Sequence, residues 1–280
     1  NIINILISCL FYYLNQEISV FGFQLFQKLL KNSKEMKLFI NVSGPNKIYM
    51  SSSNKIWPKP IRAIIFDNDG TLSDTEWAYS WAHKQITGEE LSWDLKPQLM
   101  GKSALETCKF YVSHYHLNKS PEELVKERSK ILEQCWKKVK LLPGATEITD
   151  SFKSMGIPMC IATSSRRESF EQKIAEHKDL LNKMHHAVCG SEVKRGKPNP
   201  DIFELALEKF NDKSLKPDEI IVFEDSPLGI KAANVLGMAS VYVPDPNVDI
   251  EKSLAEVDAK ATIVIKSLND FDFNMFDWFK

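Results

Sequence analysis

The feature that most constrains the fold of this chain is a series of short apolar runs separated by helical patterns. The first run is RAIIF, which begins at residue 62, and the later ones are IPMCIAT, HAVCG, EIIVF, ASVYV and ATIVI. Such runs, rich in Val and Ile, are typical of strands buried on both faces of a sheet. Most are separated by helical patterns: ATEITDSFKSM, RRESFEQKIAEH, DIFELALEKF and PLGIKAANVLGM. This alternation predicts an α/β fold with a doubly wound, Rossmann-like parallel sheet.

The stretch 77–142 interrupts this alternation. It lacks a strand pattern and holds charged, helix-favouring segments such as PEELVKERSKILEQCWKKV, at whose start Ser120 and Pro121 are typical helix-initiating residues. An all-helical insertion directly after the first strand predicts a small cap over the sheet. We therefore expect a Rossmann-like core formed by 59–76 and 143–280, with 77–142 as an inserted α-helical cap domain.

The N-terminal stretch differs from the rest of the chain. It is rich in Asn, Ile, Phe and Lys, and a polar segment, MSSSNKIWPKP, begins at Met50 shortly before the first strand pattern. We expect residues 1–58 to be a poorly ordered extension outside the patterned domains. A chain beginning at Met50 should then be as stable and as active as the full chain. An additional helix or a targeting segment is the alternative interpretation.

Composition and charge exclude several classes of partner. Hydrophobic residues make up 43% of the chain and charged residues 26%, and the net charge is -1 with a pI near 6.7. This is the balance of a globular enzyme, and it offers no basic field to nucleic acid or anionic lipid. No run reaches the roughly 20 apolar residues that a membrane-spanning helix requires, and the nearest is IINILISCLFYYL at the N-terminus. We expect no nucleic-acid partner and no membrane partner, and we expect a monomer.

The cysteines indicate a reducing compartment. There are five of them, widely spaced, and no C-x-x-C pair occurs among them. An odd number with this spacing fits neither a disulfide framework nor a zinc site. We expect free, buried thiols, which are typical of cytoplasmic proteins.

Carboxylates follow the first predicted strand. In open α/β sheets, ligands bind beyond the carboxyl ends of the strands, so these positions are the ones to inspect. Asp67 and Asp69 come directly after RAIIF. Residues two apart on an extended chain point the same way, so both should face one site while Asn68 faces away. Gly70 permits the sharp turn that follows.

Further polar residues follow two other predicted strands. Thr163 and Ser164 stand after IPMCIA, Lys197 lies in GKPNPDIF, and Glu224 and Asp225 follow EIIVF. Each has an ordinary reading as a helix cap or an exposed lysine. Together, acidic oxygens at one sheet edge repel one another unless a cation lies among them, and oxygen-only ligation suits Mg²⁺. Hydroxyl, backbone N–H and lysine donors opposite the metal are what a phosphoryl group requires.

These motifs resemble those of the haloacid-dehalogenase-like (HAD) superfamily of phosphohydrolases over about 61–264. Its four motifs are matched by FDNDGTLSDTE, IATSS, GKPNPDIF and FEDSPLGIKAA. The chain is most similar to the pseudouridine-5'-phosphatase group, and the segments that carry this likeness are MGKSALET, ATSSRRESFEQK and HKDLLNKMHHAV. Asn68 departs from the apolar residue usual in the family, which raises a question of packing rather than of catalysis.

The resemblance implies a role for each motif residue. Asp67 would be the nucleophile and a metal ligand. Asp69 would be the acid/base and would offer its backbone carbonyl to the metal. The ligands of the phosphate would be Thr163, Ser164 and Lys197, and those of Mg²⁺ would include Asp225 and Glu224. Because Asp69 must start protonated to protonate the leaving oxygen, we expect its pKa to lie above the free value of about 3.9.

The cap should contact the leaving group, and Glu76, Trp77 and Lys102 are the candidate contacts. Trp77 and Trp81 lie four apart on a predicted helix, where they would either pack in the core of the cap or offer a face to a base. The predicted substrate is a small phosphorylated metabolite, with pseudouridine 5'-phosphate as the leading candidate. One alternative is a sugar-phosphate phosphatase or a phosphomutase, although Thr71, where some phosphomutases carry an apolar residue, favours a phosphatase. Another is a catalytically silent binding protein.

Overall fold

The computed structural model describes residues 41–42, 48–49 and 55–279. In an N-terminal unit, strand β1 (Asn41–Val42) pairs antiparallel with β2 (Ile48–Tyr49). A larger compact unit begins at Lys55 and holds all the elements that follow. The predicted extension 1–58 therefore lies largely outside the described residues. At its end, Lys55 Nζ donates to Phe276 O over 2.8 Å and Trp57 Nε1 donates to Asp218 O over 2.7 Å.

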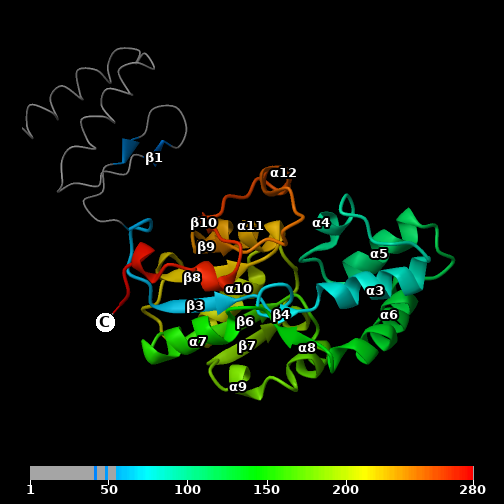
Figure 1. Cartoon of the computed structure of the whole chain (residues 1–280), viewed down its shortest axis with the longest axis horizontal. Helices are drawn as coiled ribbons and strands as arrows, with labels where there is room; N and C mark the ends of the chain where they lie inside the picture. Colours follow the sequence, from blue (N-terminus) through cyan, green and yellow to red (C-terminus); the bar gives the residue numbers. More distant parts are fainter. Residues whose placement is uncertain (1–40, 43–47, 50–54, 280) are drawn as a thin grey trace, which may run out of the picture. The chain divides into compact units, whose positions relative to one another are not determined.

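A six-stranded parallel sheet forms the centre of the larger unit (Figure 1), and the predicted fold class is confirmed. Its order is β10-β9-β8-β3-β6-β7, so the first strand of the unit, β3, lies between β8 and β6. Each strand coincides with one of the apolar runs: β3 (Ala63–Phe66), β6 (Met159–Thr163), β7 (His186–Cys189), β8 (Ile220–Glu224), β9 (Ala239–Tyr242) and β10 (Ile263–Val264).

Helices cover both faces of the sheet, because successive strand residues point to opposite sides. Ile64 and Phe66 pack with Phe152 in one apolar cluster, whereas Ile65 packs with Phe203 in another. Helix α10 lies against β6 and β7, and α11 lies against β8 and β9. The helices of the core are α7 (Ala145–Ser154), α8 (Arg167–Ile174), α9 (Lys178–Leu181), α10 (Asp201–Lys209), α11 (Pro227–Leu236) and α12 (Ile250–Glu256), with short 3₁₀ turns at Gly190–Glu192, Pro217–Glu219, Leu268–Asp270 and Phe273–Met275.

Of the described helices between β3 and β6, the first four form a group at one end of the sheet (Figure 1): α3 (Glu76–Thr87), α4 (Lys96–Leu99), α5 (Ala104–His114) and α6 (Pro121–Trp136). At the start of α6, Ser120 and Glu123 form a reciprocal capping box, which explains the sharp beginning of this helix. The segment is not wholly helical. Strand β4 (Ser73–Asp74) pairs antiparallel with β5 (Lys140–Leu141), where the chain leaves the core and returns to it.

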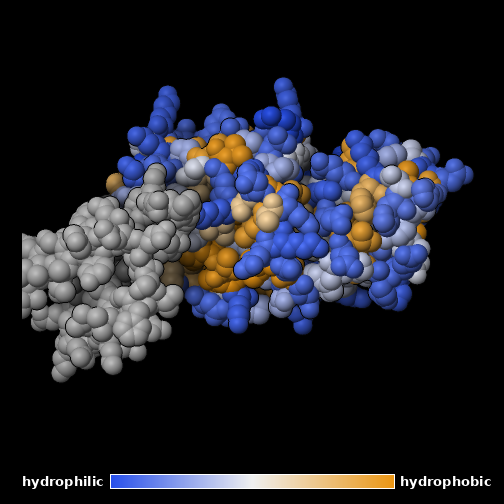
Figure 2. Space-filling view, turned by 90° about the horizontal axis from the view of Figure 1, so that it is seen from above, coloured by the Kyte–Doolittle hydropathy of each residue, from blue (hydrophilic) through white to orange (hydrophobic). Residues whose placement is uncertain are grey.

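The surface of the described part mixes polar and apolar residues, and hydrophilic side chains are spread over the face shown in Figure 2 with smaller hydrophobic patches between them. None of the described helices is long and apolar enough to cross a membrane. The four cysteines in the described part are free and buried, as the sequence predicts; they are Cys108, Cys135, Cys160 and Cys189.

Candidate active site

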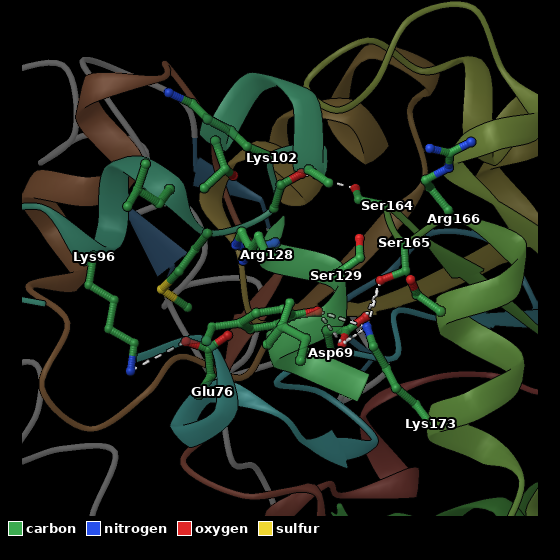
Figure 3. A pocket seen from close by; sticks show the side chains of 18 of the residues that line it. Asp69, Glu76, Lys96, Lys102, Arg128, Ser129, Ser164, Ser165, Arg166 and Lys173 are labelled. Carbon is green, nitrogen blue, oxygen red and sulfur yellow. Dashed lines mark hydrogen bonds and ion pairs between the residues drawn. The ribbon is translucent and has the colours of Figure 1, made fainter. Parts of the chain in front are cut away.

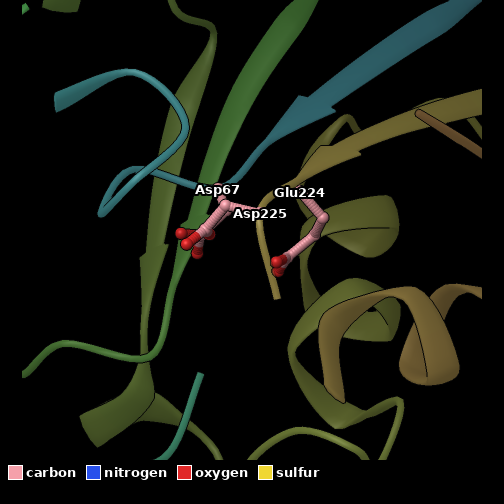
Figure 4. A group of neighbouring side chains, drawn as sticks. All are labelled: Asp67, Glu224 and Asp225. Atoms are coloured by element: carbon pink, nitrogen blue, oxygen red, sulfur yellow. The ribbon is translucent and has the colours of Figure 1, made fainter. Parts of the chain in front are cut away.

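Three buried carboxylates converge where β3 and β8 end (Figure 4). The register pairs Phe66 with Phe223, and the Asp67 N–H donates to Phe223 O over 2.9 Å. The residues at the carboxyl ends of these strands therefore lie side by side, and oxygens of Asp67, Glu224 and Asp225 all lie within 4.8 Å of one another.

Lys197 connects two of these carboxylates. Its buried Nζ lies 2.7 Å from Asp67 Oδ1, bonds Glu224 Oε1, and donates to Ala162 O over 3.2 Å. Burial alone would lower the pKa of Lys197, but the charges of Asp67 and Glu224 outweigh it and raise that pKa. The lysine is therefore a fixed cation within the carboxylate group.

The carboxylates have more negative charge than Lys197 alone can balance. Burial, Glu224 and Asp69 raise the pKa of Asp67 to about 7 although Lys197 opposes them. Burial and the charges of Glu224 and Asp67 raise the pKa of Asp225 well above its usual range. An oxygen-only donor set with raised pKa values fits a hard divalent cation such as Mg²⁺, which would favour the ionised carboxylates.

Glycines allow the chain to approach these carboxylates closely. Gly70 has a φ of +81°, and a Cβ there would lie 2.2 Å from Asp225 Oδ2. A Cβ on Gly229, in the first turn of α11, would lie 2.0 Å from Glu224 Oε1. Any larger residue at either position would displace a carboxylate of the site.

Asp69 lies beside this group and has its own set of donors. Its carboxylate accepts hydrogen bonds from Thr163 Oγ1 over 3.0 Å, from Ser165 Oγ over 3.0 Å and from Tyr79 OH over 2.9 Å, and it forms an ion pair with Lys173. Burial alone would raise the pKa of Asp69, but Lys173 and the other donors lower it below its usual range. The expectation of a raised pKa is therefore wrong for this arrangement.

The two predicted phosphate-binding hydroxyls, those of Thr163 and Ser164, lie at the same sheet edge and form hydrogen bonds within the protein. Thr163 Oγ1 bonds Asp69 and also accepts from the Ser165 N–H over 3.1 Å. Ser164 Oγ donates to Gly101 O, in the loop before α5, over 2.9 Å. Both residues remain candidates for the phosphate site, since the backbone following β6 is close to Asp69.

A pocket opens between this sheet edge and the cap (Figure 3). The predicted contacts Glu76 and Lys102 line it, and Glu76 forms a 3.3 Å ion pair with Lys96. Burial raises the pKa of Glu76 against the charge of Lys96. Trp77 does not line the pocket, and it is 38% exposed.

The position of Trp77 follows from the geometry of α3. Glu76 and Tyr79, three apart, face the pocket, while Ala78 and Ala82 pack against α6. Trp77 therefore points away from the pocket and away from α6. Trp81, 36% exposed, points the same way. Neither tryptophan packs in the core of the cap or offers a face to the pocket, which were the two expectations for them.

Several pocket residues were not predicted from the sequence, namely Tyr79, Arg128, Ser165 and Lys173. Each lies within or beside an ordinary helical pattern. Of these four residues, only Ser165 carried a signal in the sequence, because its hydroxyl lies in the second motif.

Asn68 contributes to local packing rather than to the group of carboxylates. It is fully buried, and its Oδ1 accepts a 3.0 Å hydrogen bond from Ser73 Oγ, whereas its Nδ2 has no partner among the described residues. It therefore supports the turn after β3 and leaves the chemistry to Asp67 and Asp69.

Comparison with known proteins agrees with this geometry. The family model for haloacid dehalogenase-like hydrolases matches residues 64–243. The chain belongs to this family. It is 39% identical over 225 residues to a probable pseudouridine-5'-phosphatase of Drosophila melanogaster, covering 78% of this chain and 94% of the relative. It is 37% identical over 218 residues to the mitochondrial (DL)-glycerol-3-phosphatase 1 of Arabidopsis thaliana, covering 75% and 72%.

A solved structure supports the fold. The CbbY protein of Rhodobacter sphaeroides in complex with phosphate superimposes with a TM-score of 0.64 at 21% identity, covering 75% of this chain and 96% of that one. The prediction that this chain of the HAD family is a phosphoric monoester hydrolase is confirmed by the family match and by the phosphatase relatives.

Proposed function

We propose that this phosphatase depends on Mg²⁺ and transfers the phosphoryl group of a small monoester to Asp67 and then to water. The observation that carries the proposal is the convergence of Asp67, Glu224 and Asp225 at one buried edge, with Lys197 bonded to two of them. The raised pKa of Asp67 supports a cation at this point, since an ionised nucleophile is needed near neutral pH.

The residues that would hold Mg²⁺ are Asp67, Asp225 and Glu224, together with the backbone carbonyl of Asp69. When bound, the ion would neutralise charge on the phosphoryl oxygens and favour the ionised form of Asp67. Thr163, Ser164 and Lys197 would hold the oxygens of the phosphoryl group, because each lies at the same sheet edge.

In the first step, a carboxylate oxygen of Asp67 bonds to phosphorus, and the bond from phosphorus to the leaving oxygen breaks. Asp69 gives its proton to that oxygen. In the second step, a water molecule gives a proton to Asp69 as its oxygen attacks phosphorus, and the bond to Asp67 breaks. Because Lys173 favours the ionised form of Asp69, this carboxyl must exchange some of its present donors when substrate binds.

The cap limits access of water to these steps. Ser164 Oγ donates to Gly101 O, and Ser226 Oγ donates to Met100 O over 3.3 Å. These two hydrogen bonds join the cap loop that contains Met100 and Gly101 to the core segments that follow β6 and β8, next to the carboxylates. The pocket beneath it suits a small monoester.

The leading substrate is pseudouridine 5'-phosphate, supported by the relative from Drosophila melanogaster. Glycerol 3-phosphate and other sugar phosphates are the alternatives, supported by the plant relative and by a phosphorylated carbohydrates phosphatase of Thermotoga maritima. A phosphomutase is the second candidate function, supported by the fold of a β-phosphoglucomutase from Clostridium difficile. We also propose that the enzyme is a monomer and that it is cytoplasmic; the free cysteines support the second part of this proposal.

The test is a panel of monoesters assayed with Mg²⁺ for release of phosphate and ranked by kcat/KM. We expect pseudouridine 5'-phosphate to rank first. If glycerol or hexose phosphates rank about tenfold or more above it, the substrate proposal is wrong. A requirement for a sugar bisphosphate, with no net release of phosphate, would identify a phosphomutase.

A further inference from the structure

Arg128, on the cap helix α6, is a buried cation without a counter-ion. It is 8% exposed, and its Nε has no hydrogen-bond partner. Within the described range 55–279, no carboxylate lies within ion-pairing distance of its guanidinium. Burial of a charged guanidinium without a counter-ion is costly.

The other buried cations of the described part all have partners. Lys96 pairs with Glu76, and Lys173 pairs with Asp69. Lys197 pairs with Asp67 and with Glu224. Buried charges in proteins are normally paired in this way because desolvation without a partner is costly. Arg128 is therefore an exception that calls for an explanation.

The immediate surroundings of Arg128 are neutral. Its guanidinium lies 5.0 Å from the centroid of the Tyr79 ring. Burial raises the pKa of Tyr79 and of Tyr111 to about 12, against the opposing charge of Arg128, so both remain protonated near neutral pH. Arg128 also acts on Tyr111 through a side-chain hydrogen bond. Neither this bond nor the contact with an aromatic face gives the guanidinium a counter-ion or its Nε a partner.

The pocket is where a partner could lie. Arg128 and its neighbour Ser129 line the cap side of the pocket, while Asp69 lines the core side (Figure 3). Asp67 belongs to the same lining. In the proposed reaction, phosphorus lies beside Asp67. A substrate group that reaches Arg128 on the cap side would then belong to the leaving group rather than to the phosphoryl group.

We propose that Arg128 anchors the leaving group of the substrate by hydrogen bonds to an oxygen acceptor that is separated from the phosphoryl group. This inference rests on the proposed phosphatase activity and adds a residue that determines specificity. The acceptor is a hydroxyl, a carbonyl or a carboxylate oxygen, and the substrate supplies the partner that the protein lacks. The protein keeps an unpaired buried charge for this purpose at the expense of stability.

The experiment compares Arg128→Met and Arg128→Lys with the wild type on four phosphate monoesters. Glycerol 3-phosphate offers hydroxyls, pseudouridine 5'-phosphate also offers carbonyls, and 2-phosphoglycolate offers a carboxylate. Ethyl phosphate offers no distant oxygen. Lys130→Met, an exposed position two residues along the same helix, is the matched control.

We expect Arg128→Met to lower kcat/KM by about 10- to 100-fold for the best of the oxygen-bearing substrates, as for the loss of hydrogen bonds to a charged group. We expect Arg128→Lys to keep part of this activity, and Lys130→Met to keep all of it. Ethyl phosphate should be hydrolysed by Arg128→Met and by the wild type at nearly the same rate. The substrate with the largest loss identifies the kind of oxygen that Arg128 binds.

The melting temperature separates this role from a structural one. Removal of an unpaired buried charge should leave the Tm of the substrate-free protein unchanged or higher. A lower Tm together with equal losses on all four substrates would overturn the inference and leave the phosphatase proposal intact. No release of phosphate from any monoester by the wild type would instead refute the proposed function itself.

Discussion

The ammonium of Lys173 forms a buried ion pair with the carboxylate of Asp69, and the same lysine touches the cap. Lys173 lies on the core helix α8, and its Nζ donates to Tyr79 OH over 2.7 Å and lies 4.8 Å from the centroid of the Trp136 ring. Tyr79 and Trp136 belong to cap helices α3 and α6. One lysine thus connects the proposed acid/base residue with two helices of the cap.

Lys173→Met should destabilise the protein by about 3 kcal/mol, because it leaves a largely buried carboxylate, 15% exposed, without its cation. The pKa of Asp69 is lowered in the folded state, so this stabilisation is present above its unfolded pKa of about 3.9 and is lost only as the pH falls through the lower folded value. Urea unfolding near neutral pH measures the effect. The control is Lys231→Met, whose partner Asp258 is 99% exposed; its loss should be below about 1 kcal/mol. Equal losses would contradict the assignment.

The pH dependence of activity should change in the same variant. Without Lys173, burial raises the pKa of Asp69, so the protonated form needed in the first step persists to higher pH. The alkaline limb of the profile of kcat/KM against pH should therefore move to higher pH in Lys173→Met. Tyr79→Phe removes only one donor and should move it by less. An unmoved limb in Lys173→Met would show that another group controls it.

The affinity for Mg²⁺ should increase with pH up to about 7. Burial and neighbouring carboxylates raise the pKa of Asp67 to about 7, so below that value the ion must displace a proton. In the absence of the ion, the favourable contribution of protonated Asp67 to stability is lost as the pH rises through that value. The rise in Tm on addition of Mg²⁺ should thus be larger near pH 8 than near pH 5. Equal rises would refute the role of Asp67 as a ligand.

Two glycines offer a matched pair of substitutions. Gly70 and Gly88 have φ values of +81° and +79°, but only a Cβ at Gly70 would collide, with Asp225. Both Gly→Ala changes should cost about 1 kcal/mol for the left-handed backbone. Only Gly70→Ala should also lower the affinity for Mg²⁺, by about 10- to 100-fold, as displacement of a supporting group does. Unchanged affinity in Gly70→Ala would place the metal away from Asp225.

The sheet and the carboxylate group were predictable because both depend on local sequence. Buried parallel strands are continuous apolar runs, so RAIIF and EIIVF could be recognised directly. Once these strands are parallel neighbours, Asp67 and Glu224 must lie side by side at their carboxyl ends. The short strands β4 and β5 could not be predicted, since two residues carry no periodicity.

The pocket residues depend on packing between distant elements, which the sequence pattern does not show. Lys173 and Arg128 have the sequence context of exposed helix residues, yet α8, α3 and α6 bury them together. The lowered pKa of Asp69 has the same origin, because Lys173 is 104 residues away in the sequence. Trp77 illustrates the converse: its position in the motif region suggested a contact, but its helical phase points it outward.

The covalent role of Asp67 is tested most directly by trapping the intermediate. The enzyme is mixed with Mg²⁺ and substrate, quenched in acid during turnover, and reduced with borohydride, which converts an aspartyl-phosphate to homoserine. Peptide mass spectrometry then locates the change. We expect homoserine at position 67 in the wild type, none elsewhere, and none in Asp67→Asn, which should also lose turnover while keeping its fold. Homoserine at another aspartate, or substantial phosphate release by Asp67→Asn, would contradict it.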